Sequence, residues 1–268
     1  MTQNIIVTET PSELRRLARA VLRGNWKKLF VGMLIYSIFA VLIPNLVSVT
    51  VKSLSYTVYL EGYDMNYDFP AFLYIYQLVM IGILQFGVYS FILHYLRTRE
   101  VRYDRLFAGF ERFAPVFLVS LLVSVLVGLW SLLFIIPGFV AMFRYFMALY
   151  ILHDDPQVGV LGALRASKWM TNGNKAKIFL TILSFIGWRI LASVPTVILD
   201  SMILRGGLAE VPDTALVIIE FALSLPAYFL MVYSETTMGL MYEIMSGRLR
   251  KTPPAGNGFM PQGGGSVL

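Results

Sequence analysis

One apolar stretch decides the fold: residues 113–153 read FAPVFLVSLLVSVLVGLWSLLFIIPGFVAMFRYFMALYILH, with Arg144 as the single charged residue. As one helix rising ~1.5 Å per residue it would measure ~60 Å, about twice the ~30 Å hydrocarbon core of a bilayer. Pro137 and Gly138 fall near its middle, and this pair favours a turn. The stretch therefore predicts two membrane-spanning helices joined at Ile136-Pro137-Gly138.

The composition of the whole chain agrees with a membrane protein. Hydrophobic residues make up 57% of the 268 residues and charged residues only 14%, against about 25% charged in soluble domains. The mean hydropathy is +0.69. The chain has no cysteine, which excludes disulfides, thiolate catalysis and cysteine-based metal sites.

Apolar runs of suitable length predict six spans and an all-α, polytopic membrane helix bundle of three hairpins, with basic interfacial helices on the cytoplasmic side. The predicted spans cover residues 29–51, 71–95, 114–136, 138–152, 178–199 and 214–234, the last helix continuing to 245. The domains expected are a cytoplasmic N-terminal segment (1–28), the transmembrane domain (29–246) and a disordered Pro- and Gly-rich cytoplasmic tail (247–268).

The distribution of Lys and Arg predicts the orientation. Six basic residues precede the first span, five lie between spans two and three, four between spans four and five, and three follow span six. The opposite side carries only Lys52 and Arg205. The positive-inside rule then places both termini in the cytoplasm, with the chain in the cell membrane. The net charge of +6 is thereby assigned to the membrane surface and not to nucleic acid.

The segment before the first span predicts an amphipathic helix. Thr10, Pro11 and Glu13 have the pattern of an N-cap, a first-turn proline and a capping box. Its basic face suggests contact with anionic lipid headgroups, through Arg15, Arg16, Arg19, Arg23, Lys27 and Lys28. We expect the apolar face to lie on the membrane surface; packing under the helix bundle is the alternative.

A short motif recurs along the chain. Residues 24–30 read GNWKKLF and residues 173–179 read GNKAKIF, and each block leads from a basic segment into a span. Residues 108–113 are a looser third copy. Either three hairpins repeat in parallel, or Gly-Asn followed by Lys simply marks the end of a surface helix before a span.

These blocks also carry a family resemblance. The chain resembles the Gram-positive integral membrane proteins known as domain of unknown function 975, which are similar to the membrane domain of some glycerophosphoryl diester phosphodiesterases. The matching stretches are Gly24-Asn25-Trp26, Ile136-Pro137-Gly138, Arg144 to Ala148, Tyr150 to Asp154, Ser167 to Lys175 and Leu183 to Trp188. The resemblance implies a six-helix bacterial membrane protein and implies no activity.

Three charged residues inside the predicted spans are candidate site residues: Arg144, Arg189 and Glu220. Each costs about 2.5–3.5 kcal/mol in a bilayer. Their depths predict a pair between Arg144 and Glu220, with Arg189 reaching Glu220 or backbone carbonyls. Such a cluster would bind an ion or anionic headgroup as substrate, or fix helix register as a buried ion pair. Glu235 and Glu243 are expected near the cytoplasmic end, in contact with water.

No pattern in the sequence predicts catalysis, a cofactor or a metal site. His94 and His153 belong to no metal-binding motif, and Asp154-Asp155-Pro156 is typical of a helix cap. We therefore expect a non-enzymatic protein that binds or organises membrane components, with lipid, a membrane-protein partner or a second copy as partners. The alternative is a small transporter, channel or lipid-moving protein that uses Arg144, Arg189 and Glu220.

Overall fold

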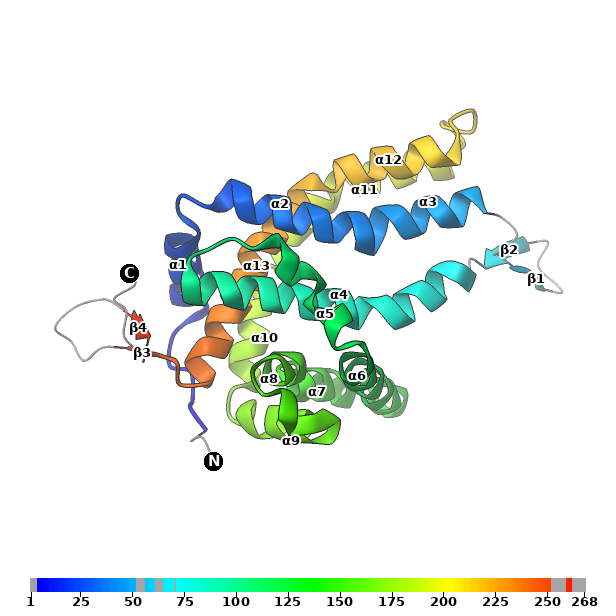
Figure 1. The fold of residues 1–268 in the computed structure, drawn as a ribbon. Helices are drawn as coiled ribbons and strands as arrows, with labels where there is room; N and C mark the ends of the chain where they lie inside the picture. Colours follow the sequence, from blue (N-terminus) through cyan, green and yellow to red (C-terminus); the bar gives the residue numbers. More distant parts are fainter. Residues whose placement is uncertain (1–3, 52–55, 61–64, 70, 252–258, 262–268) are drawn as a thin grey trace.

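The structure is a computed structural model that describes residues 4–51, 56–60, 65–69, 71–251 and 259–261. Helices dominate, and two short hairpins lie at the chain's periphery (Figure 1). The first half holds α1 (Pro11–Leu22), α2 (Trp26–Ser37), η1 (Ile38–Leu42), α3 (Ile43–Thr50), β1 (Tyr56–Leu60), β2 (Met65–Phe69), α4 (Ala71–Thr98), η3 (Tyr103–Phe107), α5 (Ala108–Glu111) and α6 (Phe113–Leu133). The second holds α7 (Ile135–Tyr145), α8 (Ala148–Asp154), η4 (Pro156–Val158), α9 (Gly159–Met170), α10 (Lys175–Leu183), α11 (Ile186–Leu204), α12 (Asp213–Leu223), α13 (Leu225–Met245), β3 (Leu249–Lys251) and β4 (Phe259–Pro261).

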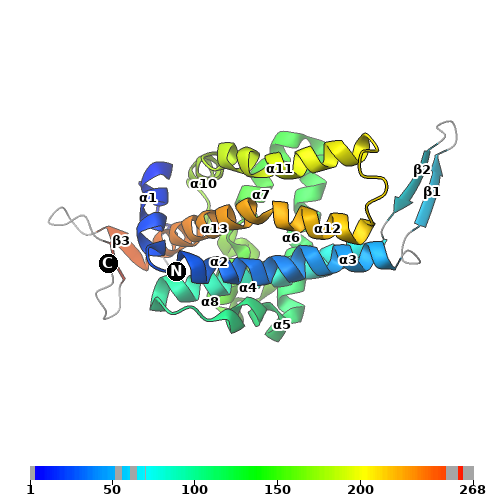
Figure 2. The same cartoon turned by 90° about the horizontal axis from the view of Figure 1, so that it is seen from above.

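The molecule has two distinct ends. Helix α1, the start of α2 and the end of α13 lie together at what we call the basal end, on the left of Figures 1 and 2. The β1–β2 hairpin and the α11–α12 connection lie at the opposite, distal end. The α2–η1–α3 helix, α4, α11 and the α12–α13 pair run between these ends, whereas the α6–α7 hairpin crosses them (Figures 1 and 2).

Within the described residues, five helical segments are long and apolar enough to cross a membrane: 26–50, 71–98, 113–133, 135–154 and 186–204. A sixth, α12 with α13, qualifies if the two helices form one span bent by 45° at Ser224. The predicted all-helical class with apolar spans is therefore confirmed, and the count is five or six. The first β hairpin falls in the predicted outer loop, parts of which, like most of the predicted disordered tail, lie outside the described residues.

The hairpin turn in the opening stretch lies slightly earlier than predicted. Phe134 is extended, with φ −158° and ψ 148°, and α7 begins at Ile135. Pro137 thus sits in the first turn of α7, where its missing N–H is not needed. A Cβ added to Gly138 would lie 2.1 Å from Ser131 Oγ, so this glycine lets α7 approach α6 closely.

Three of the predicted spans are interrupted or bent. The first passes through a π-helical segment, η1, a feature frequently found at functional sites. Tyr76 OH and Asn45 Nδ2 donate to the carbonyls of Phe39 and Val41 in that segment, at 2.6 and 2.8 Å. The predicted span 178–199 is divided between α10 and α11, and the sixth bends at Ser224.

Helix α1 packs against protein at the basal end. The predicted capping box between Thr10 and Glu13 is present. Leu14, Ala18 and Leu22 are completely buried, and α1 contacts α13 and α10. The expectation that the apolar face lies on the membrane is therefore wrong, because α13 and α10 cover that face; the alternative, packing under the bundle, is confirmed. The cationic groups of Arg16, Arg19, Arg23, Lys27 and Lys28 remain exposed, whereas Arg15 donates to the Ser184 carbonyl at 3.1 Å.

Two of the three repeated blocks share one turn geometry. Gly24 and Gly173 have left-handed φ values of +87° and +82°, which glycine adopts without strain. Asn25 and Asn174 follow them and begin α2 and α10. No positive φ occurs at Gly109, so the looser third block lacks this turn. The similarity between the blocks is therefore restricted to two matching helix–helix turns, at Gly24 and at Gly173.

Candidate functional site

The best-built candidate site is a pocket between α4, α11 and α13. Its volume is about 440 Å³, within the ~300–1,000 Å³ typical of ligand pockets. It is lined by Gln85, Arg189, Ala227, Tyr228, Leu230, Met231 and Glu235. The lining combines an acid, a base and an amide with apolar side chains, and we call it the Arg189–Glu235 pocket.

The carboxylate of Glu235 is held by a chain of polar groups from other helices. The Gln85 side chain on α4 lines the same pocket as Glu235 and interacts favourably with its carboxylate. Tyr36 OH on α2 in turn donates to Gln85 Oε1 at 3.4 Å, which orients the amide. Glu235 is thereby positioned from two neighbouring spans.

Arg189 is the second charged group of the pocket. It attracts Glu235 electrostatically, yet it makes no ion pair within 4.0 Å in the described part of the chain. Its side chain is exposed, whereas Glu235 is half-buried. An anion and a cation separated by a pocket of this size can contact both ends of one zwitterionic ligand.

Residues next to the pocket lining in the sequence expose apolar side chains. Ile190, next to Arg189, is 63% exposed and Phe229, next to Tyr228, is 48% exposed. In a chain whose apolar helices are long enough to span a membrane, such exposed side chains are expected to face lipid. A ligand with acyl chains could therefore reach the pocket sideways from the bilayer.

The structure separates the three charged residues that the sequence brought together. Arg189 lines the pocket just described, Arg144 lines a second pocket with Trp130, and Glu220 a third with Asn45. The predicted Arg144–Glu220 pair is wrong. Two residues at equal depth in the membrane can still lie on helices that are not neighbours. Helix α7 packs on α6, α9 and α10, whereas α12 packs on α3, η1, α11 and α13. The predicted contact of Arg189 with Glu220 is likewise absent from the ion pairs of the described residues.

Sequence reasoning missed Glu235 and Gln85 as site residues. Glu235 was expected to contact water near a helix end, and its partner Gln85 carries no charge to draw attention inside α4. One signal was available: a glutamine in the apolar run 71–95 needs hydrogen-bond partners inside the bundle. The partner itself lies about 150 residues away in the chain, which no local pattern reveals.

A second polar cluster lies at the basal end. Arg97 donates to Glu243 at 3.0 Å and pairs with Asp154 at 2.9 Å. Asp154 also accepts from Tyr242 at 2.6 Å and pairs with Arg248. The side chains of Asp154 and Glu243 are only 8% and 4% exposed, so the expectation of a water-exposed Glu243 is wrong, because α4 supplies Arg97. We assign this cluster to the joining of α4, α8 and α13.

Among the described residues, no group of three or more His, Cys, Asp or Glu side chains is placed to hold a metal ion. Asp155 caps η4 by accepting from the Gln157 N–H at 3.0 Å, as its sequence predicts. Asp154, its neighbour, belongs instead to the basal ion cluster.

The fold and the pocket define a helical protein with apolar candidate membrane spans and a charged pocket among them. The chain belongs to the family described as "Protein of unknown function (DUF975)", which matches residues 6–143 and 133–249. No curated protein and no solved structure matches it.

Proposed function

We propose that this protein binds a zwitterionic lipid in the Arg189–Glu235 pocket, as a non-enzymatic component of a bacterial cell membrane with both termini in the cytoplasm. The observation that carries the proposal is a positioned carboxylate facing an unpaired guanidinium across about 440 Å³. The phosphate of the headgroup would contact Arg189, which suits phosphate geometry. The ammonium group would contact Glu235.

Three features support the orientation and the lipid partner. Helix α1, which precedes the first span, and the end of α13, which follows the last, lie at one end of the molecule (Figures 1 and 2), as an even number of spans requires. Five exposed basic residues of the N-terminal segment lie at or next to α1 at that same end, where an anionic inner leaflet would attract them. The resemblance to the membrane domain of glycerophosphoryl diester phosphodiesterases also favours contact with phospholipid. These features favour lipid over nucleic acid as partner, and they leave room for a membrane-protein partner or a second copy.

The test is lipid binding by the purified full chain. Native mass spectrometry in detergent would compare phosphatidylethanolamine adducts on the wild type, Arg189→Gln, Glu235→Gln and the double variant. Losing one charge-assisted contact should weaken binding about tenfold. The double variant should lose less than the product of the two single effects, because both residues hold one ligand.

Arg205→Gln is the matched control, because it removes an exposed arginine in the turn after α11. It should bind like the wild type. Unchanged binding in both single pocket variants would refute the proposal.

One observation favours movement of the lipid as a second candidate function. The first span contains the π-helical η1, the predicted span 178–199 is divided after Leu183, and the α12–α13 pair bends by 45° at Ser224. Broken spans surround substrate sites in many transporters. Vesicles containing the protein and a fluorescent phosphatidylethanolamine would then exchange that lipid between leaflets, and Arg189→Gln would slow the exchange. If the wild type does not move the lipid between leaflets, the protein binds the lipid without transporting it.

A further inference from the structure

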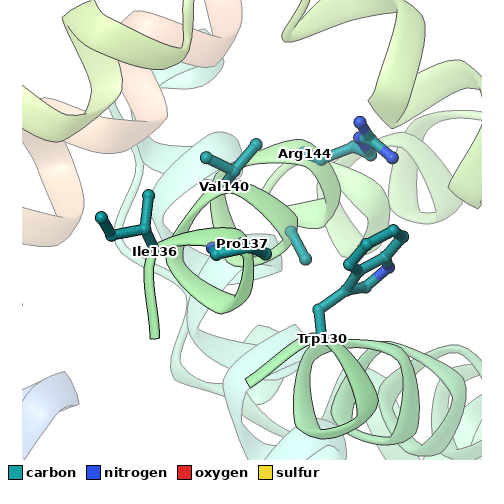
Figure 3. Close-up of a pocket in the computed structure, with 6 residues that line it drawn as sticks. Trp130, Ile136, Pro137, Val140 and Arg144 are labelled. Carbon is teal, nitrogen blue, oxygen red and sulfur yellow. The ribbon is translucent and has the colours of Figure 1, made fainter. Parts of the chain in front are cut away.

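The pocket around Arg144 is separate from the Arg189–Glu235 pocket. It occupies about 250 Å³ between the two helices of the α6–α7 hairpin. Trp130 comes from α6 and the remaining lining residues from α7: Ile136, Pro137, Val140, Ala141 and Arg144. Figure 3 shows the Arg144 guanidinium and the Trp130 indole on the same side of this pocket.

The backbone that carries Arg144 is held in place by α9. The helix is interrupted between Tyr145 and Ala148, which removes the helical partner of the Arg144 carbonyl. Ser167 Oγ of α9 donates to that carbonyl instead at 2.9 Å, and Thr171 Oγ1, directly after α9, lies 3.2 Å from it. The interruption is thus stabilised by side chains whose position fixes the base of the Arg144 side chain.

Among the described residues, the Arg144 guanidinium has no ion-pair partner within 4.0 Å. Its Nε is buried without a hydrogen bond. It lies nine residues into the candidate span 135–154, about 14 Å along the helix. An unpaired cation at such depth costs about 2.5–3.5 kcal/mol, so an anion there would be strongly favoured.

The surroundings indicate what kind of anion fits. Beside the pocket, the hairpin tip exposes Leu132, Phe134 and Ile135, which are 84%, 73% and 74% exposed. The volume is smaller than that of pockets that enclose a whole drug-sized ligand. A headgroup fits inside while its acyl chains lie against the apolar tip. Neither the lining residues nor any ion pair supplies a carboxylate to receive an ammonium group.

We infer that the Arg144 pocket binds the phosphodiester of an anionic lipid that carries no ammonium group. The guanidinium holds two phosphate oxygens in a bidentate contact, and the Trp130 indole N–H, the donor beside it, contacts a third oxygen or the glycerol. This site differs in selectivity from the Arg189–Glu235 pocket, because only the latter combines both charges. The inference does not depend on the proposed function.

The experiment uses the full chain in detergent, with phosphatidylglycerol, phosphatidylethanolamine or inorganic phosphate added before native mass spectrometry. The wild type should retain phosphatidylglycerol. Arg144→Gln should retain about tenfold less, since it loses a charge-assisted bidentate contact. Arg144→Lys should recover part of the loss, because it restores the charge without the planar fork. Arg102→Gln, an exposed arginine outside the spans, is the matched control and should behave as the wild type.

Trp130→Phe is a second variant of the same pocket, which keeps the inference testable if the arginine variants misfold. It preserves the ring, removes the N–H, and should weaken phosphatidylglycerol binding about threefold. Phosphatidylethanolamine binding by Arg144→Gln should persist, which separates this site from the other pocket. Equal phosphatidylglycerol retention by the wild type, Arg144→Gln and Trp130→Phe would overturn the inference. Displacement of the lipid by millimolar inorganic phosphate would assign the pocket to free phosphate and overturn its lipid assignment.

Discussion

The basal end and the distal half of this molecule are packed in different ways. At the basal end, α1, α8, α9 and the adjoining halves of α4 and α13 bury contiguous hydrophobic clusters. In the distal half, α12 has no buried residue and α11 buries only Leu199. The exposed distal side chains are nevertheless apolar, such as Leu191, Val197 and Ile198.

This difference indicates that the basal end contacts water, whereas the distal helices contact lipid. The basal end holds together by protein–protein packing and buried ion pairs, as a soluble domain does. The distal helices expose apolar side chains that water would disfavour and lipid tails accept. Substitutions that remove basal contacts should therefore cost far more stability than equivalent distal ones, and four predictions test this ordering.

Arg97→Ala should have the largest effect. It leaves the carboxylates of Asp154 and Glu243 buried without their shared cation, and such losses typically cost about 3–5 kcal/mol. Unfolding of the purified protein in mixed micelles of mild detergent and dodecyl sulfate measures the change in free energy.

The matched control is Arg102→Ala. Arg102 pairs with Asp104 at 2.8 Å, but their side chains are 51% and 57% exposed, and such exposed pairs contribute little to stability because water screens them. The hydrogen bond from Arg102 lowers the pKa of Asp104, so any contribution of this pair should fade as the pH falls through the carboxyl pKa. Equal losses in Arg97→Ala and Arg102→Ala would show that the basal ion cluster is not stabilising.

Leu14→Ala should reduce stability by about 2–5 kcal/mol, the usual range for a buried leucine. Leu14 is completely buried in α1 and belongs to the hydrophobic cluster that includes Met241 of α13. A loss below about 0.5 kcal/mol would instead indicate that α1 lies on the membrane surface, away from α13. The same micelle unfolding series measures it.

Asn174→Ala should release the N-terminal segment at a cost of roughly 1–3 kcal/mol, because buried polar groups lose their partners. Asn174 Oδ1 accepts from the Val7 N–H at 2.9 Å, and Nδ2 donates to the Ile5 carbonyl at 2.9 Å. Hydrogen exchange at Val7 should accelerate.

Asn25→Ala, at the matching turn, is the control for Asn174→Ala. Its side chain makes a single hydrogen bond to Tyr95 at 3.3 Å, so exchange at Val7 should stay slow. Faster exchange in both variants would contradict a local clamp at Asn174.

Leu191→Ala should have the smallest effect, under about 0.5 kcal/mol. Leu191 lies in α11 and is 63% exposed, so its truncation removes little protein packing. A loss comparable to that of Leu14→Ala would mean that another chain covers α11, and the oligomeric state would then be the next measurement.

Much of the fold could be predicted from the sequence because the signals are local. Apolar run length identifies the spans, and Thr10 with Glu13 marks the start of α1. The amphipathic pattern of α1, however, fits a lipid surface and a protein surface equally, so its packing on α13 could not be decided. The interruption between Leu183 and Ile186 contains no proline to announce it.

The candidate site was predicted less well, because a site depends on lateral neighbours. Arg189 was identified as a charged residue in a span, and it does line the main pocket. Its partner Glu235 was assigned to water and Glu220 took its place, since depth along a helix gives no information about direction around it. Gln85, which holds Glu235, becomes meaningful only once α4 and α13 are known to be adjacent.

The most direct test of the account is whether a polar cavity reaches Arg189 and Glu235. The chain has no cysteine, so an introduced thiol reports alone. Ala227→Cys lies in the pocket lining, and Ile190→Cys lies on the exposed apolar side of α11. A charged, membrane-impermeant thiol reagent applied to reconstituted vesicles from both sides should label Ala227→Cys, more slowly when phosphatidylethanolamine is abundant, and leave Ile190→Cys unlabelled. Protection of both positions would mean a dry, closed bundle and would contradict the account.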